Sequence, residues 1–161
     1  MSEEKKENNN SNILFHGSNV VVKTPEVRTL GHNKDFGYGF YCTRFENQAK
    51  KWALTKKNQH IVTLYEYEEE PNLKVLNFEK MTDKWLDFVA DCRRGIKHEY
   101  DIVEGPMADD QIWDYVEDFV AGNISREAFW ALARFKNPTH QIVFCTEKAL
   151  ACITYRDFYE I

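Results

Sequence analysis

The chain has 161 residues, of which 43% are hydrophobic and 14% aromatic, and its formal net charge is −5. This length supports one domain with a substantial core, and the acidic balance argues against a general grip on nucleic-acid backbones. No apolar run is long enough for a membrane span or a signal peptide, so we expect a cytoplasmic protein. Charged and Asn-rich residues open the chain, so we expect a disordered tail over 1–11 and a single domain over 12–161.

The first half of the chain alternates short apolar runs, which predict strands, with one helical pattern. Thr43 and Glu46 have the spacing of a capping box, and the helix that follows them runs to about Lys57. Before that helix, Gly37 and Gly39 let the backbone turn tightly or come close to a ligand. The predicted strands are residues 13–16, 20–22, 40–42, 61–67 and 73–78, with a turn at 17–19.

The second half carries three amphipathic helical patterns, which we expect to form one inserted layer on the sheet over about 82–137. Each pattern starts at a residue that can cap a helix and ends at a glycine or at Asn-Pro. The capping residues are Thr82 or Asp83, Asp109 or Asp110, and Ser125. The predicted helices are residues 83–95, 110–122 and 125–137; the strands are 100–103, 141–145 and 153–158, and Thr146 caps a helical turn at 147–150.

The four cysteines are scattered through the chain without a paired short spacing. Each lies among apolar residues, so we expect buried free thiols rather than disulfides or a zinc site. The sequence predicts no bound metal. The cysteines are Cys42, Cys92, Cys145 and Cys152.

Three segments combine polar or aromatic side chains with predicted strands: His16-Gly17-Ser18, Gly37-Tyr38-Gly39-Phe40-Tyr41 and Gln141-Ile142-Val143-Phe144. Together they resemble the ADP-ribosyltransferase superfamily, in the His-Tyr-Glu branch that includes the PARP enzymes and diphtheria toxin. The whole chain is also similar to a bacterial family of small proteins with that fold. Its hallmarks include His-Gly-Ser, Asp-Phe-Gly-x-Gly-Phe-Tyr, Gly-Pro-x-Ala-Asp-Asp and Gln-Ile-x-Phe-x-Thr. The resemblance implies an α+β fold, an ADP-ribosyltransferase-like split β-sheet sandwich with an inserted helical layer, and we expect the three segments to lie on adjacent strands.

The resemblance also implies NAD as the substrate and gives roles to individual residues. His16 would bond the adenosine ribose, the backbone of Gly17 would hold the nicotinamide carboxamide, and the Tyr41 ring would stack on nicotinamide. Gln141 stands where the family has Glu, so it can hold the ribose hydroxyl but carries no negative charge and takes no proton. The implied catalytic residues are Gln141, Tyr41 and His16, and the implied NAD-binding residues are His16, Gly17, Ser18, Phe36, Gly37, Gly39, Tyr41 and Trp52.

Some of these residues also have ordinary structural explanations. Gly37 and Gly39 fit a glycine-rich turn next to core aromatics, and Trp52 fits the core face of its helix. Asp109 and Asp110 are candidates for the acid/base that Gln141 cannot supply, but acidic residues are also favoured as caps at a helix start. These alternatives stay open at the level of sequence.

We therefore expect an NAD-dependent mono-ADP-ribosyltransferase that transfers ADP-ribose to a macromolecular acceptor, as a bacterial toxin or effector. Two alternatives are an NAD- or ADP-ribose-binding module without turnover and an NAD glycohydrolase. The implied partners are NAD, an acceptor that is a protein rather than a nucleic acid, and an antitoxin or regulator, with no membrane partner.

Overall fold

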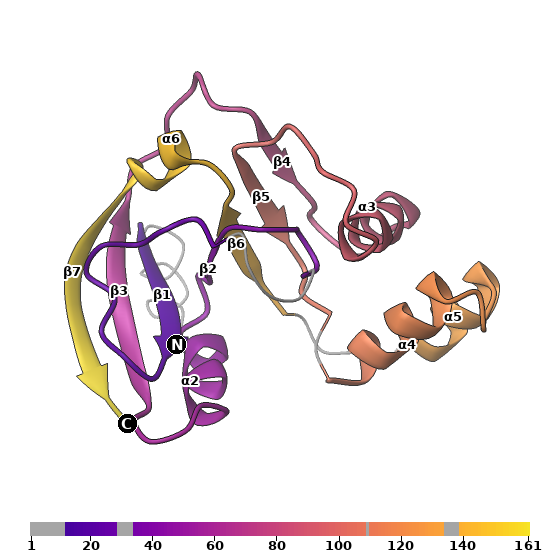
Figure 1. The fold of residues 1–161 in the computed structure, drawn as a ribbon, viewed down its shortest axis with the longest axis horizontal. Coiled ribbons are helices and arrows are strands. Elements are labelled where there is room, and N and C mark those ends of the chain that lie inside the picture. Colours follow the sequence, from indigo (N-terminus) through magenta and orange to yellow (C-terminus); the bar gives the residue numbers. More distant parts are fainter. Residues whose placement is uncertain (1–11, 29–33, 109, 134–138) are drawn as a thin grey trace, which may run out of the picture. The chain divides into compact units, whose positions relative to one another are not determined.

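The structure is a computed structural model that describes residues 12–28, 34–108, 110–133 and 139–161. The predicted tail at 1–11 lies outside the described residues. Those residues form seven strands in two sheets and five helices, which confirms the α+β class (Figure 1). The described residues form two compact units: the first combines residues 12–24, 42–71 and 151–161, and the second combines the described residues of 25–41 and 72–150. No helix among the described residues is long and apolar enough to cross a membrane.

The first unit is a three-stranded antiparallel sheet with one helix packed on it. The strand order is β1-β3-β7, with β1 at Ile13–Ser18, β3 at Ile61–Tyr67 and β7 at Ile153–Glu160. The helix is α2 (Glu46–Leu54). Its buried alanines pack with apolar side chains of the sheet, so α2 closes the core on that face. The core residues of this cluster are Ala49, Ala53 and Val62, with Phe15, Leu64 and Tyr159 against them.

Two predictions for β1 and its neighbourhood are wrong. The predicted turn at 17–19 begins too early, because Gly17 pairs with Val62 and the strand continues to Ser18. Residues 20–22 do not form a strand. The backbone of Val22 bonds to side chains instead of to a ladder, since its N–H donates to Thr63 Oγ1 at 3.4 Å and its carbonyl accepts from the Tyr65 hydroxyl at 2.5 Å.

The predicted capping box of α2 is also wrong. The residue before the helix is Phe45, which gives no side-chain cap, and Thr43 Oγ1 instead accepts from the Phe45 N–H at 3.0 Å. The helix ends at Leu54 rather than at Lys57, because the Thr55 hydroxyl donates to a carbonyl of the last turn at 2.6 Å.

The second unit is built on a four-stranded sheet that is covered by helices. The strand order is β2-β6-β5-β4, with β5 and β6 antiparallel and β4 and β5 parallel. Val103 and Val143 of the sheet share one buried core with α3, α4 and α5, so the predicted helical layer is present and β5 interrupts it in sequence. The elements are β2 (Phe40–Cys42), β4 (Val75–Asn77), α3 (Asp83–Arg93), β5 (Ile102–Gly105), α4 (Asp110–Val120), α5 (Arg126–Ala133), β6 (Gln141–Phe144) and α6 (Glu147–Leu150).

Most predicted helix boundaries of this unit are confirmed by capping contacts. Thr82, Ser125 and Thr146 each accept a hydrogen bond from a backbone N–H three residues later, at 3.1 to 3.3 Å. Gly95 and Gly122 follow α3 and α4 with φ of 83° and 79°, in the left-handed region that glycine adopts without strain. The predicted end of the third helix at Asn-Pro lies outside the described residues.

The close packing of α2 on β1 predicts that Gly17→Ala destabilises the protein. A Cβ there would lie 2.1 Å from the Ala49 carbonyl oxygen and 2.7 Å from the Ala53 nitrogen, so helix or strand must shift. We expect a loss of about 2 kcal/mol or more in the free energy of unfolding, measured by urea denaturation. As a control, Gly122→Ala meets no atom within 4 Å and should cost only the strain of its positive φ, about 1 kcal/mol. Equal losses in the two variants would contradict this reading of Gly17.

Candidate functional site

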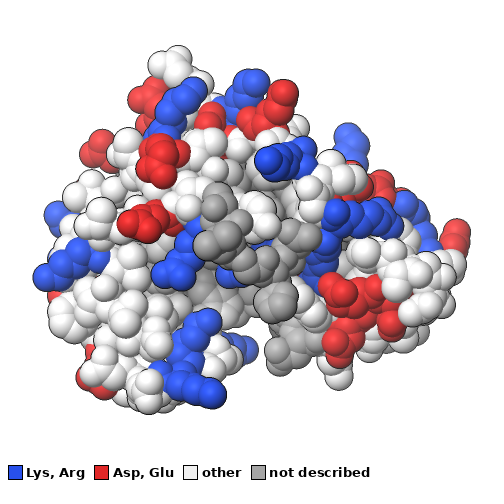
Figure 2. All heavy atoms as spheres, viewed as in Figure 1, with Lys and Arg blue, Asp and Glu red and all other residues white. Residues whose placement is uncertain are grey.

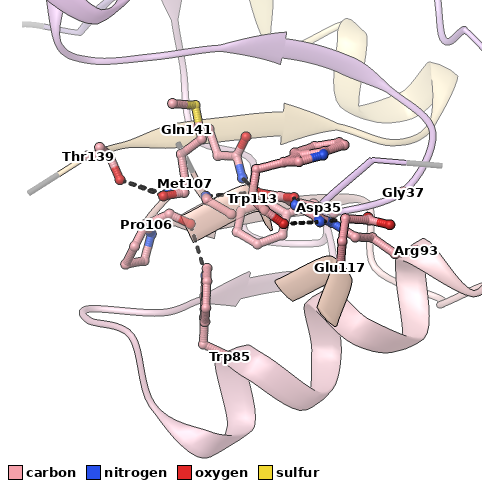
Figure 3. A network of polar contacts seen from close by, with 12 residues as sticks. Asp35, Gly37, Trp85, Arg93, Pro106, Met107, Trp113, Glu117, Thr139 and Gln141 are labelled. Carbon is pink, nitrogen blue, oxygen red and sulfur yellow. Dashed lines mark hydrogen bonds and ion pairs between the residues drawn. The ribbon is translucent and has the colours of Figure 1, made fainter. Parts of the chain in front are cut away.

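The second unit contains a buried ion pair between Asp35 and Arg93 (Figure 3). The side chains of Asp35 and Arg93 are only 4% and 2% exposed. Arg93, the last residue of α3, donates to Asp35 Oδ1 from Nε at 3.1 Å and from Nη2 at 2.5 Å. Both donors therefore converge on one carboxylate oxygen, in charge-assisted hydrogen bonds.

The remaining polar atoms of the pair also have partners. Asp35 Oδ2 accepts from the Ala108 N–H at 2.8 Å and from Gln141 Nε2 at 3.5 Å. Arg93 Nη1 donates to Glu117 Oε1 at 2.8 Å and to the Trp113 carbonyl at 3.2 Å, and its guanidinium lies 3.7 Å from the centroid of the Trp113 ring. Asp35, Arg93, Trp113, Glu117 and Gln141 form what we call the Asp35 network.

The loop that follows Asp35 is held at several points. The Tyr41 hydroxyl accepts from the Phe36 N–H at 3.2 Å and donates to the Gly37 carbonyl at 2.6 Å. His98 Nδ1 accepts from the Tyr100 N–H, so its Nε2 carries the proton and donates to the Phe36 carbonyl at 3.0 Å. Gly37 has φ of 81°, which a side chain would strain. The loop is therefore a fixed platform next to the ion pair.

Burial keeps one phenol and two thiols near the loop uncharged. It raises the pKa of Tyr41 well above its usual value, with the nearby Asp35 charge as the next cause. Burial also raises the pKa of Cys92 and of Cys145 to about 12. Neither the phenol nor these thiols is a base or nucleophile at neutral pH.

All four cysteines are free, and Cys42, Cys92 and Cys152 are buried, as predicted, whereas Cys145 is half-buried.

The structure brings together the second and third of the predicted segments. Tyr41 lies on β2, Gln141 lies on β6, and these strands are neighbours in the sheet. Gly39, just before β2, lets the backbone pack closely against β6, because a Cβ there would lie 2.7 Å from the Phe144 carbonyl oxygen. Gln141 reaches Asp35 through its amide, and Tyr41 reaches the next two residues of the same loop through its hydroxyl.

The first predicted segment lies in the other unit. His16, Gly17 and Ser18 belong to β1, which pairs with β3 in the three-stranded sheet, whereas β2 and β6 belong to the four-stranded sheet. Phe15 of β1 also forms an antiparallel bridge with Thr43, the residue directly after β2. The first segment is therefore joined to the second by one bridge and not by a strand ladder. His16 is half-buried opposite Thr63. The missing Cβ of Gly17 accommodates α2, and half-buried Trp52 contributes to that packing, since its Cβ would lie 3.0 Å from a Cβ at Gly17.

The candidate acid/base residues are not described in full. Asp109 lies outside the described residues, and Asp110 is the first residue of α4, with no description of its side chain. Sequence reasoning missed Asp35, Arg93 and Glu117 as members of a site. Asp35 carried a weak signal, because it opens the Asp-Phe-Gly hallmark, whereas an arginine and a glutamate on helices normally face solvent.

The family model that matches this chain is described as "Protein of unknown function (DUF3990)", and the match covers residues 12–155. No curated protein matches the chain.

The buried thiols predict that stability falls at alkaline pH. Folding raises the pKa of Cys92 and Cys145 to about 12, above the value of about 8.5 for a free thiol. The folded state therefore keeps protons that the unfolded state loses, and each thiol removes up to about 1.4 kcal/mol of stability per pH unit between these values. Urea midpoints should decline from about pH 9 upward, and the decline should be shallower in Cys92→Ala. A midpoint that stays constant up to pH 11 would contradict the burial of these thiols.

Proposed function

We propose that this chain, which belongs to the family of proteins of unknown function that its sequence matches, is an NAD-dependent mono-ADP-ribosyltransferase. In this proposal it breaks the bond between nicotinamide and ribose in NAD and transfers ADP-ribose to a macromolecular acceptor. The electron pair of the broken bond leaves with nicotinamide, and an acceptor nucleophile attacks the ribose and loses its proton.

One observation carries the proposal: Tyr41 and Gln141 lie on neighbouring strands and both bond to the same loop. This is the pairing that the resemblance to the His-Tyr-Glu branch requires of its second and third positions. The arrangement as two sheets in an α+β fold is also compatible with an ADP-ribosyltransferase-like split sandwich. The first position, His16, belongs to the other unit, and its role in binding adenosine ribose rests on the resemblance alone.

The chemistry assigned to each residue follows from its contacts. The Tyr41 hydroxyl is used by the loop, so Tyr41 would contribute its ring face to nicotinamide rather than a proton. Gln141 would accept a hydrogen bond from a ribose hydroxyl through its amide oxygen. The negative end of that amide dipole would lie next to the ribose where positive charge develops as nicotinamide leaves.

The acceptor class follows from charge. Basic and acidic side chains are interspersed on the face shown in Figure 2, and the chain carries a net charge of −5. A phosphate backbone binds best to a surface of predominantly positive charge. These features favour a protein acceptor over a nucleic acid, and a toxin of this kind would act with an antitoxin or regulator.

One observation favours the alternative of a binding module without turnover. Gln141 is only 3% exposed, and its amide nitrogen already bonds to Asp35. A glutamine that only completes a buried network would hold the fold and leave NAD uncleaved.

Nicotinamide release measured together with thermal melting tests the proposed function. NAD should raise the melting temperature, because a ligand at a hundredfold excess over its Kd stabilises the native state by about 2.7 kcal/mol. Gln141→Ala should cut nicotinamide release at least tenfold and weaken NAD binding much less, since its contact matters most in the transition state. Gln59→Ala, at an exposed glutamine, is the matched control and should match the wild type.

Adding candidate acceptor proteins to the assay distinguishes the transferase from the two alternatives. Release only with an acceptor indicates a transferase, release without one indicates a glycohydrolase, and a melting shift without release indicates a binding module. An unchanged melting temperature at millimolar NAD would reject all three.

A further inference from the structure

We infer that Asp35 is a positioning residue, which orients the Gln141 amide so that its oxygen is presented to the substrate and supplies the negative charge that Gln141 lacks. The inference rests on the proposed function, and it adds a residue that the resemblance does not assign.

The orientation of the amide follows from the chemistry of its neighbour. A carboxylate only accepts hydrogen bonds, so the NH2 end of Gln141 must face Asp35 Oδ2, 3.5 Å away. The amide oxygen then points away from Asp35, as Figure 3 shows. Asp35 itself cannot turn, because Arg93 and the Ala108 N–H hold both of its oxygens.

The same contact explains why residue 141 is Gln and not the Glu of the His-Tyr-Glu pattern. A Glu there would place a second carboxylate next to Asp35, in a place where the side chains are almost fully buried. Two buried carboxylates at such a distance cannot both stay ionised, so one would take up a proton. The neutral amide of Gln141 instead donates to the fixed carboxylate of Asp35, and neither group has to take up a proton.

The Asp35 network contains two carboxylates and one guanidinium. Arg93 is shared by two carboxylates, Asp35 at 4% and Glu117 at 53% exposure, so the three groups together carry one negative charge. The Asp35 charge acts on Tyr41 and Cys92, which burial keeps neutral, and Lys34, the residue before Asp35, places its Nζ 4.9 Å from the centroid of the Tyr41 ring. The Asp35 carboxylate, which bonds to the Gln141 amide, would favour the positive charge that develops on the ribose.

The test compares the wild type with Asp35→Asn, Gln141→Glu and the double variant Asp35→Asn/Gln141→Glu. The double variant moves the carboxylate from position 35 to position 141 and keeps one carboxylate and one amide. The kcat and KM for nicotinamide release and the melting temperature are measured on the same samples from pH 4 to 8. Asp35→Asn leaves Arg93 with a weaker partner, alone and in the double variant, so the pH dependence of Gln141→Glu carries the decision if these two variants misfold.

Gln141→Glu should add an ionisation to the pH profile of kcat, because the carboxyl groups at positions 35 and 141 would share a proton. Its folded state holds that proton more tightly than the unfolded chain does, so its melting temperature should fall relative to the wild type as pH rises from about 4 to 7. The double variant should lose both effects and recover kcat to within about threefold of the wild type, whereas Asp35→Asn should lose at least tenfold in kcat with little change in KM.

Glu117→Gln is the matched control, because it removes a carboxylate from the same arginine without touching Gln141. Placed in the background of each variant, it should leave the coupling between positions 35 and 141 intact. If the fold-changes in kcat of Asp35→Asn and Gln141→Glu multiply in the double variant, the two positions act independently. That result would overturn the inference.

The melting data separate a failure of this inference from a failure of the proposed function. A wild type that neither binds NAD nor releases nicotinamide rejects the proposed function. The pH dependence of melting still decides whether Asp35 holds position 141. A difference between Gln141→Glu and the wild type that grows with pH, and that shrinks in the double variant, upholds that coupling, because burial alone would raise the pKa of the new carboxyl group in both variants. A difference that is constant with pH, or that grows equally in the double variant, overturns it.

Discussion

The buried ion pair of Asp35 and Arg93 is the interaction on which the second unit depends. Removing one partner of such a pair costs about 3 to 5 kcal/mol, because it leaves the other charge buried and unpaired. The pair joins four separate parts of the chain, since Asp35 precedes the glycine-rich loop, Arg93 ends α3, Glu117 lies on α4 and Gln141 begins β6. The position of Gln141 relative to the loop is therefore set by electrostatics as well as by strand pairing.

The loop after Asp35 is held in one conformation next to this ion pair. Gly37 supplies the positive φ, and Tyr41 and His98 hold the backbone of the loop with bonds of 2.6 to 3.2 Å. Because Tyr41 and Gln141 both bond to this short segment, their separation cannot change without breaking buried hydrogen bonds. Such prior fixing of side chains is what positioning of a substrate requires.

Much of the local structure could be predicted from sequence, and the site could be predicted only in part. Caps such as Thr82 and stops such as Gly95 act between residues a few positions apart, so their signals lie within a short window. The continuation of β1 through Gly17 depends on pairing with β3, about 45 residues later, which no local pattern shows. Asp35 and Arg93 are 58 positions apart, and nothing in the sequence around an arginine at a helix end indicates that it is buried.

The most direct measurement of the central claim is a crystal structure with a non-hydrolysable NAD analogue. The account predicts that the Gln141 amide oxygen accepts a hydrogen bond from a hydroxyl of the nicotinamide ribose at about 2.8 Å, while its nitrogen still faces Asp35 and the Tyr41 ring lies against nicotinamide. An analogue bound without contact to Gln141, or an amide turned away from Asp35, would contradict it.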